Sequence, residues 1–531
     1  MVKALLAFAL TAPGFAFAQT AASKPTATPA PKHSATPTPT PTPRIAPTPR
    51  IAPAPELEPV AVKIDSPKVV LKQADVSNLV LKQSDRATEA NLKSELPRVD
   101  LARVLKDFDW FLRANSGYER SRFESLSGVG NIEDQILKSD VSLTKRWTTG
   151  TTTSLSWLRN SYRSEYSPLS PTFTTLPTEQ TQDIFGFTFE QALWRNSFGV
   201  SDRDRVRAAE MDMNAALVTR AQDLQAAVLE GLRAYWTAYI SQENMRQSLK
   251  AIERYENLVS TVRRKSGLGF SAPGELSQVS AELELRRQNA KTSGATYLRD
   301  ADRLVELLRL PLNADITFEI PHEINPPPRL SAVELEKLRR VRSQQLKTDA
   351  AQARVESAES EEHPAFAFVG QVYGSGIEER AADSVGEALS GSRPKYYMGV
   401  KFEHNFGSGV QNEETVNRKA QAELEKLRLE RMKLQTQNEL WDSERQTRTL
   451  YAQAVSAREQ MQLRERAYNE ISRAYNQGRT DINFVVEALN QLFAAEVSFS
   501  RALGDYQIAL ASWAAGRDEL IPDDDSQGGA R

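Results

Sequence analysis

The longest-range pattern in this chain is a helical spacing of apolar residues in two segments of roughly 70 residues each. One runs from about Gln411 to Gln477 without a proline or glycine, and the other runs from Gly199 to Ser266 with only Gly231 inside it. In the segment 199–266 the repeating positions are Leu217, Leu224, Val228, Gly231 and Tyr235. In the segment 411–477 they are Ala420, Leu424, Leu427, Leu434, Trp441, Leu450, Ala454, Ala457, Met461, Tyr468, Ile471 and Tyr475. Each segment predicts one helix of roughly 100 Å. Helices of this length do not fit around one compact core, so we expect a coiled coil or a barrel of helices.

Each long segment is followed by a short break and a second, shorter helical segment. Glycine and proline mark the first break, at Gly267, Gly269, Pro273 and Gly274. The helix after this break is predicted to end near Leu310. The second break covers residues 476–481, and the helix after it is predicted to end near Ala514. Because glycine supplies the backbone angles that a tight helix end needs, both segments are predicted to form αα-hairpins.

The two halves of the chain repeat the same order of elements. Each has a helical lead-in, at about residues 71–108 and 331–361, then an alternating stretch, a long helix, a glycine tip and a return helix. A shift of 209 residues superposes three pairs of positions, Gly269 and Gly478, Leu276 and Val485, and Leu283 and Leu492. Two interpretations stay open, a duplication that builds a ring or a pseudo-symmetric pore, and two unrelated hairpin domains. The shared order favours the duplication.

Apolar and polar residues alternate in several stretches between the lead-ins and the long helices. They cover about residues 108–123, 139–157, 183–193, 365–372 and 396–406, and the second reads as a hairpin about Thr149-Gly150-Thr151. Aromatic residues gather near the ends of these stretches, which is typical of outer-membrane barrel strands. A soluble β-sandwich would show the same alternation. The stretch 139–157 is either a membrane strand pair or an extracellular flap.

The number of strands limits what one chain can build. A closed membrane barrel needs about eight strands or more, and the sequence predicts four firm strands and at most six. Strands that cross a membrane would therefore need several chains to complete one barrel. The mature sequence has no apolar run long enough for a transmembrane helix.

The two ends of the chain are predicted to lie outside the folded part. Residues 1–18 resemble a secretory signal peptide, with Lys3, an apolar run from Ala4 to Phe15 and small residues before Gln19. Residues 19–67 are rich in Pro, Thr and Ala and predict a disordered tether, either a passive spacer or a strap toward an acidic surface such as cell wall. Residues 68–320 and 321–516 are the two predicted repeats, and 517–531 a disordered tail.

Composition excludes several classes of function. The formal net charge of -2 argues against nucleic-acid binding, and the absence of cysteine removes disulfides, thiolate metal sites and a lipidated N-terminus. The four histidines are scattered without metal-ligand spacing, at His33, His322, His363 and His404. No nucleophile elbow or phosphate-binding loop is present, so we predict neither an enzyme nor a cofactor or metal site.

Five local motifs, taken in order, resemble the TolC-like outer-membrane channels of tripartite efflux and type I secretion, over about residues 71–516. They are Phe187-Thr-Phe-Glu-Gln-Ala-Leu-Trp, Ala234-Tyr-Trp, Gly267-Leu-Gly followed by Glu275 and Leu276, Gly399-Val-Lys-Phe-Glu-His-Asn-Phe-Gly-Ser-Gly, and Tyr475-Asn-Gln-Gly-Arg-Thr followed by Val485 and Ala488. The chain departs from that family at Ala192 and Asn405, where proline is usual, and at Phe484, where an acid is common. The connection from Phe123 to Gln182 is also long for the family.

The resemblance implies a mainly α fold with a membrane β part. Long αα-hairpins of a homotrimer would form an α-barrel tunnel joined to a shared barrel of twelve strands, in the outer membrane and extending into the periplasm. The hairpin tips would contact a periplasmic adaptor (membrane fusion) protein and an inner-membrane transporter, and the barrel would contact outer-membrane lipid. The implied function is a passive exit duct that opens when an inner hairpin swings outward. The rival interpretation is a soluble periplasmic coiled-coil adaptor or scaffold.

The candidate site residues lie at the two tips, Gly269, Glu275, Gly478, Arg479 and Asp481. Glu275 and Asp481 would attract cations if they formed a narrow threefold ring. The alternative is that each caps the helix that follows it, which is favoured for Asp481 and stands level with the ring for Glu275. The glycines are expected to set the turns. Arg479 is expected either to contact an adaptor or to be solvated. We expect Tyr235 and Trp236 to pack between helices rather than to bind a ligand.

Overall fold

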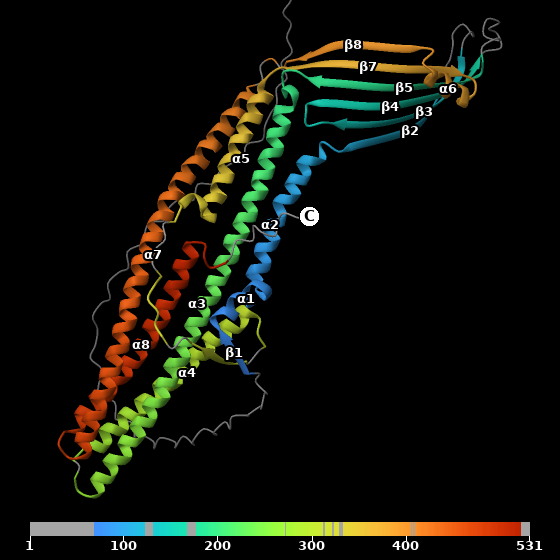
Figure 1. Ribbon diagram of the computed structural model, residues 1–531. Coiled ribbons are helices and arrows are strands. Elements are labelled where there is room, and N and C mark those ends of the chain that lie inside the picture. Colours follow the sequence, from blue (N-terminus) through green and yellow to red (C-terminus); the bar gives the residue numbers. More distant parts are fainter. Residues whose placement is uncertain are drawn as a thin grey trace, which may run out of the picture. The chain divides into compact units, whose positions relative to one another are not determined.

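The computed structural model describes most of the chain from residue 68 onward. The described residues are 68–122, 131–166, 177–270, 272–311, 314–320, 323–328, 333–404, 406 and 409–521. The predicted signal peptide and tether, Asn405, His33 and His322 lie outside them. The described residues belong to one compact unit, which is mainly helical, with a six-stranded and a two-stranded sheet (Figure 1).

Two long helices run through the helical part. They are α3 (Val200–Gly267) and α7 (Val410–Asn476), of 68 and 67 residues, and each agrees with the predicted segment to within a residue or two. Each turns back into a shorter helix, α4 (Glu275–Leu308) after α3 and α8 (Ile482–Gly516) after α7. The predicted αα-hairpins are therefore confirmed.

The shorter helices complete the helical layer around the two long ones. They are α1 (Gln73–Gln83), α2 (Asp85–Lys106) and α5 (Arg339–Glu362), with short 3-10 turns at Ser197–Gly199 and Leu335–Lys337. Next to the sheet the packing order is α2, α3, α5, α7, and towards the tips it is α4, α3, α8, α7 (Figure 1). The same two long helices thus contribute to four-helix layers at both levels.

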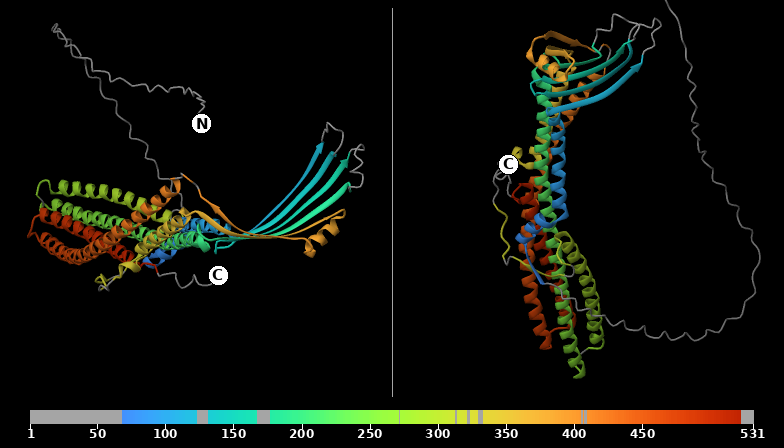
Figure 2. Two further views of the ribbon diagram at one scale, coloured as in Figure 1. Left: turned by 90° about the horizontal axis from the view of Figure 1, so that it is seen from above. Right: turned by 90° about the vertical axis from the view of Figure 1, so that its right-hand side faces the viewer.

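The six-stranded sheet is antiparallel throughout and has the order β2-β3-β4-β5-β7-β8. Its strands are β2 (Trp110–Arg122), β3 (Asn131–Arg146), β4 (Thr151–Tyr166), β5 (Glu179–Ala192), β7 (Ala365–Glu378) and β8 (Pro394–Glu403). Figure 2 shows them side by side in one curved layer. The stretch 139–157, for which the sequence left two interpretations open, forms strands β3 and β4 in the middle of this sheet rather than a separate flap.

The strand number corrects one expectation. A barrel of twelve strands shared by three chains needs four strands from each chain, whereas this sheet has six. The difference is the hairpin β3–β4, which lies within the long connection between β2 and β5. Three such sheets would supply eighteen strands, so the predicted twelve-stranded trimer does not fit this chain.

A short helix covers one end of the sheet. Helix α6 (Ala381–Ser390) packs on β7 and β5 at the ends of the strands farthest from the helical part. Ser384 Oγ donates to the Gly376 carbonyl (3.0 Å) and accepts from the Asp183 amide (3.1 Å). A Cβ at Gly374 or Gly376 would lie within 2.3 Å of a helix carbonyl oxygen, so the two glycines permit this close approach.

A small parallel sheet, which the sequence pattern did not predict, closes the main core. It pairs β1 (Lys68–Lys72) with β6 (Asp315–Glu319) over the middle of α3. Tyr235 and Trp236 are fully buried beneath it, and the Tyr235 hydroxyl donates to the Glu319 carbonyl (3.1 Å). Burial raises the pKa of that hydroxyl. Both side chains pack between elements, as predicted.

A second core joins the two hairpins near their tips. It contains Tyr255, Leu258, Val259, Val262, Val279, Leu283, Tyr475, Ile482, Val485, Val486 and Leu489. Across the same boundary, Arg254 donates two hydrogen bonds of 2.8 Å to Glu496, and both side chains are largely buried. The hairpins therefore pack on each other through apolar contacts and a buried ion pair.

Residues 517–521, predicted to begin the disordered tail, are packed against the helical part. Arg517 is 8% exposed, the Arg339 amide donates to Asp518 (2.6 Å), and the Arg339 guanidinium donates to the Ile521 carbonyl (2.9 Å). These contacts hold residues 517–521 against the start of α5. The boundary was misplaced because nothing in the sequence of this stretch reveals a distant partner.

Candidate functional site

The six-stranded sheet has one apolar face. Its register places one row of apolar side chains across all six strands: Leu112, Leu143, Leu155, Phe187, Val372 and Tyr396. Trp110, Tyr118, Leu137, Val141, Trp157, Phe185, Phe189, Phe368, Met398, Val400 and Phe402 extend this face. Many of these side chains are exposed, including Leu112 (65%) and Val400 (64%). A continuous apolar surface of this kind indicates contact with another apolar phase or with another protein.

The opposite face is polar and made largely of small residues. The row beside the apolar one contains Arg113, Ser142, Ser156, Gly186, Tyr373 and Lys395, and the next contains Phe111, Thr144, Ser154, Thr188, Gln371 and Tyr397. Thr144 and Ser154 hydrogen-bond to each other across the strands (3.1 Å). Ile136, Leu158, Ile184 and Val369 also lie on this face, so the alternation is clear in the central rows and incomplete elsewhere. An apolar face opposite a mainly polar one is the pattern of a barrel wall between lipid and water.

The hairpin β3–β4 is fixed to the helical part at its turn. Arg146 donates two hydrogen bonds, of 2.8 and 3.1 Å, to Asp202 in the first turn of α3, and Asp202 is fully buried. Asn196 donates to the same carboxylate (2.7 Å). Gly150 and Gly199 both have positive φ, and a Cβ on either would overlap the backbone of the facing segment. This turn is therefore built into the junction between sheet and helices.

Two lateral edges of the structure have no partner among the described residues. Strands β2 and β8 are the edges of the six-stranded sheet. Helix α2 leads directly into β2, and β8 leads into α7, and α2 and α7 are the outer helices of the layer next to the sheet. Each lateral edge is therefore formed by one outer helix and one outer strand.

Both outer helices carry exposed apolar stripes. On α7 the predicted repeat Leu424, Leu427, Leu434 and Trp441 is 54–65% exposed. On α2, Leu92, Leu96 and Val99 are 56–67% exposed. The chain buries the part of the predicted α7 repeat nearer the tip, including Ala454 and Tyr475, but leaves the part from Leu424 to Trp441 uncovered. A stripe of this length at helical spacing is typical of a surface that packs against another helix.

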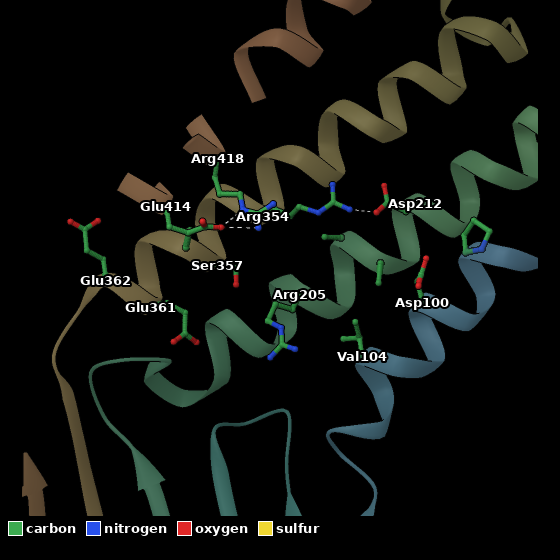
Figure 3. A pocket seen from close by; sticks show the side chains of 14 residues that line it. Asp100, Val104, Arg205, Asp212, Arg354, Ser357, Glu361, Glu362, Glu414 and Arg418 are labelled. Carbon is green, nitrogen blue, oxygen red and sulfur yellow. Dashed lines mark hydrogen bonds and ion pairs between the residues drawn. The ribbon is translucent and has the colours of Figure 1, made fainter. Parts of the chain in front are cut away.

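A charged cleft of about 730 Å³ lies between α2, α3, α5 and α7 near the sheet (Figure 3). Its charged lining residues are Asp100, Asp212, Glu361, Glu362, Glu414, Arg205, Arg354 and Arg418. Arg354 donates to Asp212, and Arg418 pairs with Glu414 (2.8 Å). Burial raises the pKa of Asp212, and the Arg354 guanidinium opposes that rise. Five acids against three arginines make this wall net acidic.

The two long helices end in the same backbone turn. Gly269 and Gly478 both adopt positive φ, 76° and 75°, and each follows the end of a long helix. The Phe270 amide donates to the Lys265 carbonyl at the first tip, and the Arg479 amide donates to the Ala474 carbonyl at the second, both at 2.9 Å. This is the bond pattern of a helix that ends in a left-handed glycine. Open space surrounds both glycines, so they set the turns.

The charged tip residues differ from one another. Asp481 precedes α8, and its carboxylate accepts from the Asn483 amide (2.8 Å), so it caps that helix. Glu275 is the first residue of α4, whose capping position is Gly274. Arg479 is exposed. Lys265 Nζ lies 3.7 Å from the centre of the Tyr475 ring and ties the first tip to the second. Burial raises the pKa of the Tyr475 hydroxyl.

Sequence reasoning did not single out the apolar side chains of the tips as a surface. Leu268, Phe270 and Phe484 are 71%, 80% and 62% exposed. Phe484 was noted only as a departure from the family's acid. Leu268 and Phe270 flank Gly269, which was an available signal, since large apolar residues in a tight turn rarely serve the turn itself. Phe484 lies in the first turn of α8. Together they give the tips an apolar contact surface.

The described residues contain neither a helix that is long and apolar enough to cross a bilayer nor a group of three or more His, Asp or Glu side chains placed to hold a metal ion. No protein-family model matches the sequence, and no curated protein matches it.

Solved structures with the same fold are nevertheless found. The outer membrane channel CmeC of Campylobacter jejuni matches with a TM-score of 0.61 at 14% identity, covering 86% of this chain and 88% of that one. The open state of the outer membrane channel MtrE of Neisseria gonorrhoeae matches with a TM-score of 0.61 at 14% identity, covering 84% and 89%.

The outer membrane protein VceC of Vibrio cholerae matches with a TM-score of 0.59 at 13% identity, covering 85% of this chain and 97% of VceC. The resemblance inferred from the motifs is thereby confirmed at the level of the fold. This chain has the fold of the TolC-like outer-membrane channels.

Proposed function

We propose that this protein is an outer-membrane channel, the passive exit duct of a tripartite efflux or type I secretion system. The observation that carries the proposal is the six-stranded sheet with a continuous apolar face, a polar opposite face and two unpaired edges. Such a sheet is stable in a bilayer only when its edges are closed by further strands. The fold neighbours described as outer membrane channels support the same function and location.

The partner that closes the sheet is another copy of this chain, in a homotrimer. One lateral edge consists of α2 and β2, and the other of α7 and β8. Both carry exposed apolar stripes, and both end in an unpaired strand. A ring built by repeating one such contact would place helices below strands around the whole circumference. The apolar face of the sheet would then contact outer-membrane lipid, and the helices would extend into the periplasm.

The tips are the proposed contact with a periplasmic adaptor and, through it, an inner-membrane transporter. Leu268, Phe270 and Phe484 offer apolar area there, and Arg479 offers an exposed charge. Apolar side chains ringed by polar groups are a common arrangement in protein contacts. Opening requires the two hairpins to move apart at their tips, which breaks the Lys265–Tyr475 contact. A gate ring of Glu275 side chains remains part of this proposal.

The duct performs no bond chemistry. Its work is to exclude lipid, to hold water and to open when the adaptor binds. The net acidic cleft between α2, α3, α5 and α7 favours passage of cations over anions if it faces the lumen.

The test is the location and mass of the mature chain. Cells are fractionated, membranes are extracted in mild detergent, and the protein mass of the purified particle is measured by light scattering. We expect an outer-membrane particle with three times the mass of one mature chain. A soluble monomer or dimer in the periplasm would overturn the proposal and favour a coiled-coil adaptor or scaffold.

A further inference from the structure

We propose that three copies of this chain close a single barrel of eighteen strands, and that the hairpin β3–β4 makes the membrane pore as wide as the helical tunnel below it. In this barrel β2 of each copy pairs with β8 of the next. This barrel rests on the proposed function as an outer-membrane channel. It adds the strands through which the copies contact each other. It also adds the class of cargo, which is solutes too wide for a twelve-stranded pore.

The directions of the edge strands permit this closure. All six strands alternate in direction, so β2 and β8, the first and the last, run oppositely. Hence β8 of one copy lies antiparallel to β2 of the next, and the alternation continues around the ring. The apolar side chains of both edges lie on the same face, with Trp110 and Leu112 on β2 and Val400 and Phe402 on β8.

The side chains of the two edge strands are exposed, as expected of strands that each have one neighbour. Nearly every residue of β2 and of β8 is exposed, whereas most of β4 is half-buried. Long flat edges of this kind are templates for pairing with another strand. The exposed stripes on α2 and α7 lie on the same two lateral edges, so one contact between copies covers both.

At the usual tilt of barrel strands, the width of six strands agrees with the width of the helical layer. At a strand spacing of about 4.8 Å and a tilt of about 40°, six strands cover about 38 Å of circumference. The four helices beside the sheet, about 9 to 10 Å apart, cover about 36 to 40 Å. Four strands would cover only about 25 Å. The added hairpin therefore brings the membrane part to the circumference of the helical part.

The resulting pore is wide. Three copies give a backbone diameter of about 36 Å for eighteen strands, against about 24 Å for twelve. Small side chains line the middle of the polar face, among them Ser142, Ser154, Ser156, Gly186 and Thr188. Barrels of this strand number enclose an aqueous channel rather than a packed interior. The barrel wall would therefore admit any solute that the tunnel admits.

Engineered cysteine pairs test the contact between copies. The chain has no cysteine, so the full-length protein is already a clean background. Asn115→Cys or Arg113→Cys on β2 is combined with Tyr397→Cys or Gly399→Cys on β8, all on the polar face. Because the register between copies is open, all four double variants are made and oxidised in intact outer membranes.

We expect at least one of these pairs to form a disulfide between chains and to give a ladder of two and three linked chains. Two control pairs bracket the result. Ser142→Cys with Ser156→Cys joins facing residues of β3 and β4, so it links within one chain and gives no ladder. Asn115→Cys with Thr188→Cys lies on strands that are not neighbours and should not link. Absence of a ladder from all four edge pairs, with the internal control linked, overturns the pairing.

Polymer labelling tests the pore width. Thr188→Cys lies on the polar face of β5 and is treated in intact cells with maleimide polymers of increasing length. The same variant is made in a chain that lacks the hairpin β3–β4, residues 131–166. This deletion connects the end of β2 to the start of β5, which lie at the same end of the sheet. We expect the shortened chain to lose labelling by the longest polymers that still reach Thr188→Cys in the full chain. Phe187→Cys, on the apolar face, is the control that should stay unlabelled.

Equal size limits in the two chains would overturn the assigned pore width. If the shortened chain does not assemble, the full-length chain still decides, because labelling of Thr188→Cys only by polymers narrower than a twelve-stranded pore would overturn the assigned width. The two proposals fail separately. A soluble chain refutes the channel itself, whereas an outer-membrane trimer without β2–β8 links refutes only the eighteen-stranded barrel.

Discussion

The first tip ends α3 with a left-handed Gly269, and the second, 209 residues later, ends α7 with a left-handed Gly478 and the same hydrogen bonds. At the other end of the molecule, the first repeat contributes four strands to the sheet and the second contributes two strands and α6. The tips are constrained by the core that joins the hairpins. The sheet accepts another hairpin because each antiparallel neighbour pairs only with the strand beside it.

Replacing one tryptophan in each long helix gives the largest expected contrast between the repeats. Trp236 is fully buried in α3, and Trp441 is 56% exposed on α7. We expect Trp236→Ala to lower the free energy of unfolding by about 3–5 kcal/mol through the cavity it leaves. Trp441→Ala should leave helix content unchanged and weaken the association of copies. Thermal unfolding by circular dichroism and light scattering on dilution measure the two effects. A trimer unaffected by Trp441→Ala contradicts the role assigned to the α7 stripe.

Removing the acid in the first turn of each long helix compares the two junctions with the sheet. Asp202 in α3 is buried and bound by Arg146 and Asn196, whereas Glu413 in α7 is exposed. Asp202→Ala should cost about 3 kcal/mol because it leaves a partly buried guanidinium without its partner. Glu413→Ala, the matched control, should change stability by less than about 0.5 kcal/mol. Thermal midpoints of both variants in one detergent measure this difference, and equal shifts would contradict it.

Alanine at the two tip glycines tests whether the tips are equivalent. Both glycines have positive φ and open surroundings, so only the backbone angle opposes a side chain. Gly269→Ala and Gly478→Ala should each cost about 1–2 kcal/mol. Denaturant midpoints of the two variants should agree within error. A cost at only one tip would mean that the two turns are not held in the same way.

The smallest expected effects separate the two acidic tip residues. Asp481→Ala removes a hydrogen-bonded cap and should cost about 1 kcal/mol. Glu275→Ala should cost less than Asp481→Ala, because the capping position of α4 is Gly274 and not Glu275. Single-channel currents of the same variants test the gate. Unchanged cation preference in Glu275→Ala would remove Glu275 from that role.

The long helices were predictable because their periodicity is a local property of the chain. The boundaries of α3 and α7 follow the uninterrupted apolar repeat and the glycines at each tip. The cap at Asp481 was also among the predicted roles, because a short acid before an apolar run suits a helix start. The apolar face of β5 could be read from the alternation of Phe185, Phe187 and Phe189.

Other features depend on distant partners and were not predictable. The sheet β1–β6 joins two five-residue segments far apart in the sequence, and neither is long enough to show a period. Arg146 and Asp202 are two charged residues among many, and nothing in the sequence around either one indicates that they form an ion pair.

The sequence by itself determined the two long hairpins, their glycine tips and the alternation of the strands, because backbone propensity and side-chain period act over a few neighbouring residues. Only the tertiary structure decided that β3 and β4 belong to the sheet, that six strands and not four form its wall, and that the stripe from Leu424 to Trp441 stays exposed. These depend on which segments pair and on which surfaces remain uncovered, and both are settled by contacts between residues that lie far apart along the chain.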